Sequence, residues 1–167
     1  MQLRQAKPED FEMIKTFFDQ GRLFQNSLGF VQWKPGYPSF ELFLEDCRLN
    51  RGFVISENGT DIGYVVIDMQ GDREYDRLSN IWKLSGRYAV VHRMVFSDQV
   101  RGKGQAGVLL GLIENMVREE GIGVVRFDTG IKNFPMQRVL EKSGYVNLGV
   151  FDFIWGERYA YEKQLYI

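Results

Sequence analysis

The sequence of 167 residues has very little of several features that mark particular protein classes. Cys47 is the only cysteine, which excludes an internal disulfide and a thiolate cluster for zinc, and we expect no metal. The formal net charge of −1 gives no broad cationic surface for nucleic acid. No apolar run approaches the roughly eighteen residues that cross a bilayer, and the first residues lack a signal-peptide pattern. We therefore expect a cytoplasmic protein that binds neither nucleic acid nor membrane.

The composition that remains is that of a folded protein. Hydrophobic residues make up 44% of the chain and charged residues 26%, which favours a globular chain over a disordered one. The length is that of one domain, and the chain contains no linker composition or internal repeat. A single domain over residues 1–167 is the expectation.

Apolar spacing predicts four helices and seven strands. The helices are expected after Pro8-Glu9-Asp10, near Phe40, from Gly104 to a stop at Gly121, and from Asn133 to a stop at Ser143-Gly144. The strands are expected at the amino end and over residues 53–56, 62–67, 88–96, 124–128, 145–151 and 157–166. This order joins an antiparallel start to a βαβ centre, which indicates an α+β or mixed α/β sheet.

Two connections have their own signals. Asn58-Gly59 supplies the positive φ angles of a tight hairpin turn between the second and third strands. Residues 70–87 are polar and charged apart from Ile81 and Trp82, and Asp72, Glu74 and Asp76 alternate with basic residues. We expect this second connection to be long and exposed to solvent.

A glycine-rich segment, residues 102–107, leads from the fourth strand into a helix. Backbone N–H groups and the positive end of the helix dipole meet there, and glycines let phosphate oxygens approach, so the segment predicts a phosphate site. The simpler interpretation is a tight turn with close packing. A dinucleotide site with Asp128 on the ribose is a further reading, although the loop does not follow the first strand of a repeating βαβ unit. The P-loop pattern does not match.

Residues 94–106 resemble the acyl-CoA signature of GNAT acetyltransferases, a hydrophobic strand end followed after four residues by R/Q-x-x-G-x-G/A. The fixed positions are filled, in the two registers that fit, by Arg101, Gly104 and Ala106 or by Gln99, Gly102 and Gly104. The second half of the GNAT core is similar to residues 125–129, 141–145 and 158–163. The resemblance covers about residues 50–167. It implies the GNAT fold, a mixed central sheet of about seven strands with a splayed parallel pair, flanked by about four helices.

The resemblance implies an N-acetyltransferase that moves the acetyl group of acetyl-CoA directly to a primary amine of a small molecule or peptide. A homodimer is an arrangement that similar proteins adopt. The residues implied in acetyl-CoA binding are Met94, Val95, Phe96, Arg101, Gly102, Lys103, Gly104, Gln105, Ala106, Gly107 and Asn133. Asn133 is equally interpreted as a plain helix cap.

His92, the only histidine, is the candidate catalytic base. Strand alternation puts residues 92, 94 and 96 on one face, toward the expected acetyl end. A catalytic histidine in serotonin N-acetyltransferase aligns with His92, while the simpler reading is a packed, hydrogen-bonded core residue. Many GNAT enzymes have a tyrosine at the position of Leu140, where it acts as the general acid for the leaving thiolate of coenzyme A. The resemblance therefore implies that the thiolate here leaves unassisted or takes a proton from another group, such as Tyr145 or Tyr161.

Substrate selection is expected from segments outside the cofactor core. The candidate substrate-binding residues are the aromatic side chains of Trp33, Tyr37 and Trp82, for which packing is the simpler reading. Two alternatives stay open: an acyl-CoA-binding sensor of the same fold with weak catalysis, suggested by Leu140, and a dinucleotide oxidoreductase.

Overall fold

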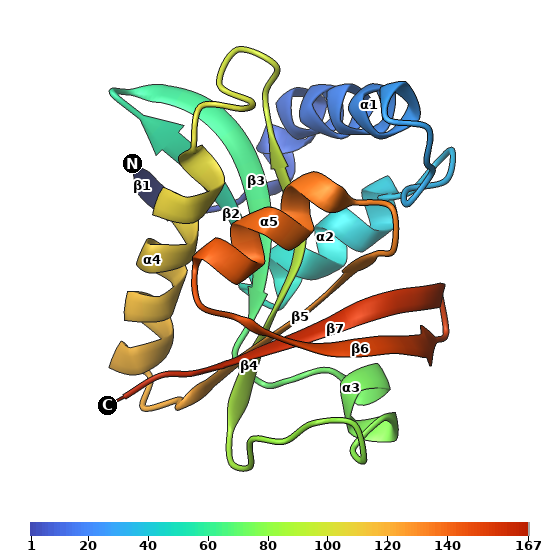
Figure 1. Cartoon of the computed structure of the whole chain (residues 1–167). Coiled ribbons are helices and arrows are strands. Elements are labelled where there is room, and N and C mark those ends of the chain that lie inside the picture. The colour runs from blue at the N-terminus through green and yellow to red at the C-terminus, as the bar shows by residue number, and fades with distance from the viewer. Residues whose placement is uncertain (167) are drawn as a thin grey trace. The chain divides into compact units, whose positions relative to one another are not determined.

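The computed structural model describes residues 1–166; Ile167, the last residue of the expected domain, lies outside the described residues. Figure 1 shows the elements along the chain. In chain order they are β1 (Gln2–Gln5), the 3-10 helix η1 (Pro8–Asp10), α1 (Phe11–Ser27), α2 (Phe40–Arg48), β2 (Gly52–Glu57), β3 (Thr60–Asp68), α3 (Arg73–Arg77), β4 (Tyr88–Phe96), α4 (Gln105–Glu119), β5 (Val124–Gly130), α5 (Phe134–Lys142), β6 (Val146–Phe153) and β7 (Gly156–Gln164).

The seven strands form one mixed sheet in the order β1-β2-β3-β4-β5-β7-β6. β4 and β5 run parallel, whereas β1 with β2, β2 with β3, β5 with β7 and β6 with β7 are antiparallel. The expected mixed sheet with a parallel pair is confirmed. The described residues contain five α-helices where about four were expected, and α3 is the additional one.

Contacts divide the chain into two compact units, and each is described by itself. The first unit contains Met1–Ile67 and His92–Gln105. The second contains Asp68–Val91 and the chain from Ala106 onward. β4 therefore contributes its first residues to the second unit and its last residues to the first.

An antiparallel ribbon of β1, β2 and β3 forms the base of the first unit. Asn58 and Gly59 adopt φ angles of 51° and 78° between β2 and β3, which confirms the predicted hairpin turn. Ser39 caps the amino end of α2, because its side chain accepts a hydrogen bond from the Leu42 N–H at 3.2 Å.

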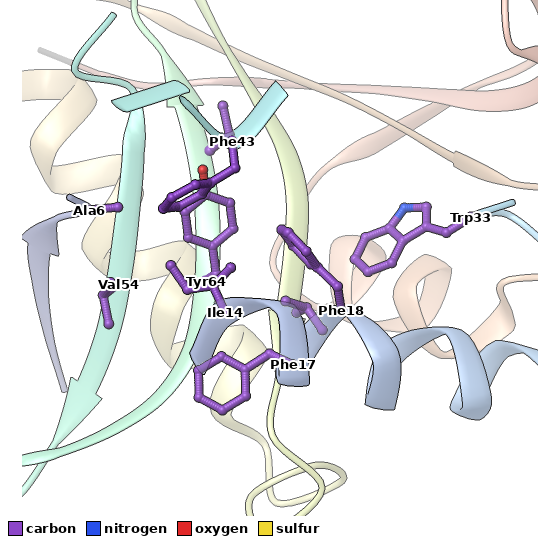
Figure 2. Packing of buried hydrophobic residues seen from close by; sticks show 10 residues of the cluster. Ala6, Ile14, Phe17, Phe18, Trp33, Phe43, Val54 and Tyr64 are labelled. Carbon is purple, nitrogen blue, oxygen red and sulfur yellow. The ribbon is translucent and has the colours of Figure 1, made fainter. Parts of the chain in front are cut away.

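The core of the first unit joins the helices to the strands. Figure 2 shows Phe18 of α1 directed toward Tyr64, with Ile14 and Phe17 on the same helix. The buried cluster consists of Ala6, Ile14, Phe17, Phe18, Trp33, Phe43, Val54, Tyr64, Val66 and Val95. The helical spacing of the apolar residues in α1 is thus explained by burial on one face.

In the second unit, β4 pairs with β5 by setting Tyr88 opposite Val124 and Val90 opposite Arg126. β7 lies between β5 and β6 and is antiparallel to both. Lys163 of β7 donates to the Glu114 carboxylate of α4, with both oxygens at 2.8 Å. This pair fastens α4 to the sheet.

The connection over residues 70–87 differs from the expectation. Tyr75 is fully buried and Trp82 is 8% exposed, their rings stack at 5.0 Å, and the Trp82 indole N–H donates to the Tyr75 carbonyl at 2.9 Å. Asp72 caps α3 by accepting the Glu74 N–H at 2.7 Å, and Glu74 is itself buried. The prediction of an exposed connection was wrong at Glu74 and Tyr75, although neighbours such as Asp76 and Arg77 are exposed. The reason is a buried cluster made by Tyr75, Ile81, Trp82, Val90, Phe153 and Ala160.

Among residues 1–166, none of the helices combines the length and apolar character that crossing a membrane requires. The same residues contain no group of three or more His, Cys, Asp or Glu side chains arranged to hold a metal ion.

Candidate functional site

The carboxyl end of β4 is packed unusually closely within the first unit. A Cβ atom on Gly63 of β3 would lie 2.3 Å from the Val95 carbonyl oxygen, and one on Gly21 of α1 would lie 2.9 Å from Val95 Cγ2 and 3.0 Å from the Trp33 ring. The neighbour of Gly63 is a backbone atom that cannot rotate away, so only glycine fits there, whereas a side chain on Gly21 would force the Val95 and Trp33 side chains to shift. The segment Met94–Phe96 is therefore held between a strand and a helix.

The residues after β4 form a compact turn. The Ser97 N–H donates to the Ile62 carbonyl at 2.8 Å, and the Val100 and Arg101 N–H groups donate to the Ser97 carbonyl at 3.2 Å. Lys103 N–H donates to the Val100 carbonyl at 3.3 Å. These bonds fix the glycine loop on the end of β4.

Arg101 uses its side chain to support this loop. Its guanidinium donates to the Phe96 carbonyl at 2.9 Å, pairs with Asp98 and lies 4.6 Å from the centre of the Phe24 ring in α1. Asp98 in turn donates its N–H to Gln20 of α1 at 3.0 Å. The side chain of Arg101 thus ties the loop to β4 and α1.

The glycines leave the outer surface of the loop open. Gly102 and Gly104 adopt φ angles of 78° and 79°, and a Cβ atom on either would meet nothing within 4 Å. α4 begins immediately afterwards at Gln105, and the first four N–H groups of a helix have no partner inside the helix. Lys103 is exposed in the same loop. Open backbone, free helix N–H groups and a lysine fit a pyrophosphate.

His92 lies in β4 and is half-buried. The next residue, Arg93, has a φ of 52°, in the left-handed region that β-strands avoid. The alternation that predicts a common face for residues 92, 94 and 96 assumes an extended backbone throughout, and Arg93 departs from it. The role of His92 remains a prediction that rests on the chemistry of its ring.

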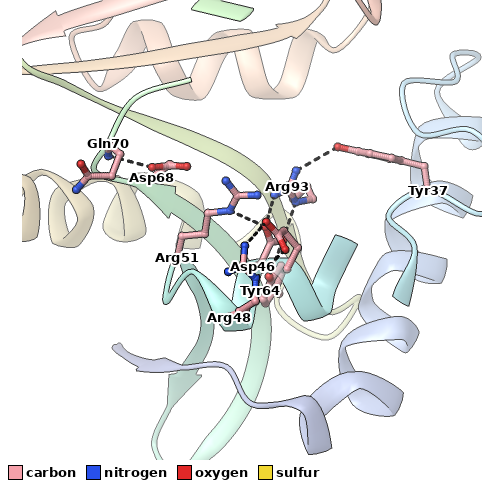
Figure 3. Close-up of polar contacts among 9 residues, drawn as sticks. Tyr37, Asp46, Arg48, Arg51, Tyr64, Asp68, Gln70 and Arg93 are labelled. Atoms are coloured by element: carbon pink, nitrogen blue, oxygen red, sulfur yellow. Dashed lines mark hydrogen bonds and ion pairs between the residues drawn. The ribbon is translucent and has the colours of Figure 1, made fainter. Parts of the chain in front are cut away.

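A buried ionic cluster next to His92 was not predicted from the sequence. Asp46 of α2 is 1% exposed and accepts hydrogen bonds from Arg93, Arg51 and Tyr64 (Figure 3). Burial lowers the pKa of Arg93, but attraction to Asp46 and Tyr37 outweighs it and the pKa is raised. Burial, and then Asp46, raise the pKa of Tyr64. One signal was available: Asp46 lies three residues after Phe43, on the buried face of the helix.

Of the expected substrate residues, Trp33 and Trp82 are packed inside the protein. Trp33 is 8% exposed and contacts the Phe18 ring edge-on at 5.8 Å. Its backbone N–H donates to the side-chain oxygen of the buried Gln25 at 2.9 Å. Trp82 packs in the second unit as described above. Tyr37, 38% exposed, lies 6.4 Å from Trp33 between ring centres and 3.5 Å from Arg93 through its hydroxyl.

Asn133 caps α5, since its side chain accepts the Met136 N–H at 3.3 Å. The plain cap interpretation is confirmed, and it leaves the expected cofactor contact as a prediction.

The positions considered for a general acid lie in the second unit. Leu140 is completely buried. Burial, and then Glu114, raise the pKa of Tyr145, while burial and Glu141 raise the pKa of Tyr161. Both tyrosines are therefore weaker acids than free tyrosine.

Asp128, the candidate ribose ligand of a dinucleotide site, is occupied within the second unit. Its carboxylate accepts from the Tyr75 hydroxyl at 2.6 Å and the Trp155 indole at 3.1 Å, and it lies 3.5 Å from Arg158. The glycine loop follows the fourth strand of a sheet that begins with antiparallel pairs, which is not the doubly wound arrangement. Both findings count against a dinucleotide site.

Comparison with known proteins gives a consistent result. The model of the "Acetyltransferase (GNAT) family" matches residues 18–145. A GNAT family acetyltransferase from Streptococcus agalactiae is 31% identical, with 99% of this chain and 96% of that chain covered and a TM-score of 0.84. A putative acetyltransferase from Staphylococcus aureus is 26% identical, with 99% and 100% covered and a TM-score of 0.74.

A more distant likeness concerns the fold alone. The aminoglycoside acetyltransferase AAC(6')-Ib, solved with coenzyme A and kanamycin, is 17% identical, with 97% of this chain and 93% of that chain covered and a TM-score of 0.74. No curated protein matches the chain.

Proposed function

Because the chain belongs to the GNAT family of acetyltransferases, we propose that it transfers the acetyl group of acetyl-CoA to a primary amine of a small molecule or peptide. The observation that carries this proposal is the open glycine loop at Gly102 and Gly104, fixed to the end of β4 and followed at once by the amino end of α4. Family membership supports the acetyltransferase activity. That the acceptor is an amine goes beyond the family assignment and is part of the proposal.

Acetyl-CoA fits the residues of the loop. Backbone N–H groups from Gly102 to Gly107 would hold the pyrophosphate, and the exposed Lys103 would add a positive charge. Arg101 would act indirectly, since its guanidinium already holds the loop. The Streptococcus protein that covers nearly all of the chain supports the same family assignment, and the solved complex of AAC(6')-Ib with acetyl-CoA supports the choice of acyl donor.

The chain would supply a proton acceptor and hydrogen-bond donors for the acetyl transfer. When bound, acetyl-CoA supplies an acetyl thioester. His92 would accept the proton that a protonated amine must lose before its nitrogen can attack. Backbone N–H groups over Met94–Phe96 would donate to the thioester carbonyl oxygen as negative charge develops on it. The C–N bond forms at the carbonyl carbon and the C–S bond breaks, so the electron pair leaves with the thiolate. The surplus proton of the attacking nitrogen passes to the thiolate or to solvent.

Leu140 supplies no proton to that thiolate, because it is apolar and buried. We therefore infer that the thiolate leaves without a proton from the side chain at position 140. This departure motivates the second candidate function, an acyl-CoA-binding sensor with weak catalysis.

We also propose that the two compact units act as one domain. The family match over residues 18–145 runs through both, and the Streptococcus protein matches 99% of the chain.

A free-thiol release assay tests the function. Acetyl-CoA is incubated with the protein and a panel of polyamines, amino acids, aminoglycosides and short peptides, while thermal unfolding is followed with and without acetyl-CoA. Amine-dependent thiol release supports the transferase. Saturable acetyl-CoA binding without release across the panel supports the sensor, and no binding at all contradicts both.

A further inference from the structure

Arg93 carries a backbone conformation that its surroundings must enforce. Its φ of 52° lies in the left-handed region in the middle of β4, between His92 and Met94. A residue with a Cβ atom adopts such a conformation at a cost in free energy, and it persists only where the surrounding structure over-determines it. Something in the first unit must therefore hold Arg93.

Asp46 holds the side chain of Arg93. The Asp46 carboxylate accepts from Arg93 Nε at 3.1 Å and from Nη2 at 2.7 Å, so the guanidinium is gripped by both oxygens. The Arg93 side chain is 8% exposed and Asp46 is 1% exposed, which leaves little freedom to either. A buried bidentate pair of this kind fixes direction as well as distance.

Asp46 is itself fixed from two other sides. Arg51 Nε donates to one carboxylate oxygen at 2.9 Å, and the Tyr64 hydroxyl of β3 donates to the other at 3.1 Å. Figure 3 shows these donors converging on Asp46, with Tyr37 lying beyond Arg93. The position of the Arg93 guanidinium is thus set by α2 and β3 together.

The conformation of Arg93 determines the direction of the peptide groups next to it. A positive φ turns the peptide group between His92 and Arg93 relative to the one between Arg93 and Met94, compared with an extended strand. The first of these peptide groups directly follows the candidate base His92, and the second begins the Met94–Phe96 segment assigned to the thioester carbonyl. Their orientation decides where N–H donors point.

We propose that Asp46 is a positioning residue for acetyl transfer, because by gripping Arg93 it fixes the peptide groups between His92 and Met94. This inference rests on the proposed function. The proposed role requires no contact between Asp46 and either substrate. It acts through Arg93, and what it preserves is a backbone conformation.

The sharpest test compares Arg93→Gly with Arg93→Ala. Both variants remove the guanidinium, but only glycine adopts a φ of about 50° without strain. We expect kcat to fall by about 10- to 100-fold in Arg93→Ala, the scale that misplaced catalytic geometry produces, and to fall clearly less in Arg93→Gly. Equal kcat values in the two variants would overturn the proposal.

Asp46→Asn tests the grip directly, and Asp10→Asn is the matched control. Asp10 also forms a bidentate pair with an arginine of the first unit, at 2.8 and 2.9 Å from Arg4. We expect Asp46→Asn to lower kcat with the Kd of acetyl-CoA unchanged, and Asp10→Asn to leave both unchanged. Equal effects of the two variants on kcat would reduce Asp46 to a structural ion pair and overturn the proposal.

A measurement that needs no acceptor separates this inference from the proposed function. Amide chemical shifts and hydrogen exchange of Arg93 and Met94 are recorded for the unliganded wild type, Asp46→Asn and Asp10→Asn. We expect changed shifts and faster exchange in Asp46→Asn, and wild-type shifts and exchange for both amides in Asp10→Asn. Unchanged Arg93 and Met94 amides in Asp46→Asn would refute the inference even if no amine substrate were found.

Discussion

Gly63 and Val95 lie so close on β3 and β4 that a Cβ atom on Gly63 would stand 2.3 Å from the Val95 carbonyl oxygen. The Ile55 side chain lies 3.1 Å from the same point and the Phe96 Cα 3.3 Å. Two of these three neighbours are backbone atoms of the strand end assigned to acetyl-CoA, and backbone cannot rotate away as a side chain can. The end of β4 can therefore lie this close to β3 only because residue 63 is a glycine without a Cβ atom.

Gly63→Ala is expected to displace the end of β4. Overpacking of this kind costs about 1–3 kcal/mol of unfolding free energy, and because Val95 moves we also expect weaker acetyl-CoA binding. Urea unfolding measures the first effect and isothermal titration the second.

Gly111→Ala is the control for that change. Gly111 lies inside α4, and a Cβ atom there meets nothing within 4 Å. Alanine in a helix interior is expected to stabilise the protein by about 0.5–1 kcal/mol without altering acetyl-CoA affinity. A Gly63→Ala protein that matches Gly111→Ala in both measurements would contradict the tight packing.

Gly104→Ala is expected to weaken acetyl-CoA binding. Gly104 has a φ of 79°, which alanine adopts only with strain, so the loop would relax and misdirect its N–H groups. Gly59→Ala is a matched control because its φ is 78°, also with open space around the Cβ position, in the turn between β2 and β3. Both variants should lose about 1 kcal/mol or more of stability, and only Gly104→Ala should raise the Kd of acetyl-CoA. A similar Kd in both would argue against the loop as the pyrophosphate site.

His92→Ala is expected to lower kcat by about 10²- to 10⁴-fold, the usual loss when a positioned base is removed, while acetyl-CoA affinity is kept. The experiment requires an acceptor from the thiol-release panel, and kcat is measured across pH. Unchanged turnover on an identified acceptor would remove His92 from the mechanism and leave it as a half-buried strand residue.

Gln25→Ala is expected to loosen the segment that carries Tyr37. The Gln25 amide oxygen accepts the N–H groups of Gln32 at 3.1 Å and Trp33 at 2.9 Å, and the residue is 7% exposed. Removing this buried acceptor should cost about 1–3 kcal/mol. Asn26→Ala, at the exposed neighbouring position of α1, should change stability by less than about 0.5 kcal/mol. Equal unfolding free energies for the two variants would show that the Gln25 bonds contribute nothing.

Acid is expected to weaken the first unit partly through Asp10. Hydrogen bonds from Arg4, the largest cause, hold the pKa of Asp10 below its usual value against the opposing effect of burial. Because the folded pKa is lower than the unfolded one, this contribution is complete above a pH of about 3.9 and is lost as pH falls through the folded pKa.

Urea unfolding of the wild type and Asp10→Asn between about pH 6 and pH 3 measures that contribution. The stability difference between the two proteins should shrink toward the acid end, and Arg4→Gln should resemble Asp10→Asn. A difference that stays constant or widens on acidification would contradict the assigned cause.

Local signals explain why much of the fold was predictable. Several elements have signals that lie within a few residues of sequence. They are the apolar residues at helical spacing in α1 and α4, the Asn58-Gly59 turn and the Asn133 cap. α3 was not predicted, since five residues are too few to show a helical period, and its burial depends on the stacked Tyr75 and Trp82.

The candidate site divides in the same way. The sequence by itself determined the glycine loop and its family, because open backbone at Gly102 and Gly104 requires only the local absence of side chains. Only the tertiary structure decided that Trp33 is core and that Arg101 supports the loop. Tertiary contacts also pair Arg93, which has a left-handed backbone conformation, with Asp46. That relationship joins residues 47 positions apart, and a buried ion pair has no period or motif along the chain by which it could be found.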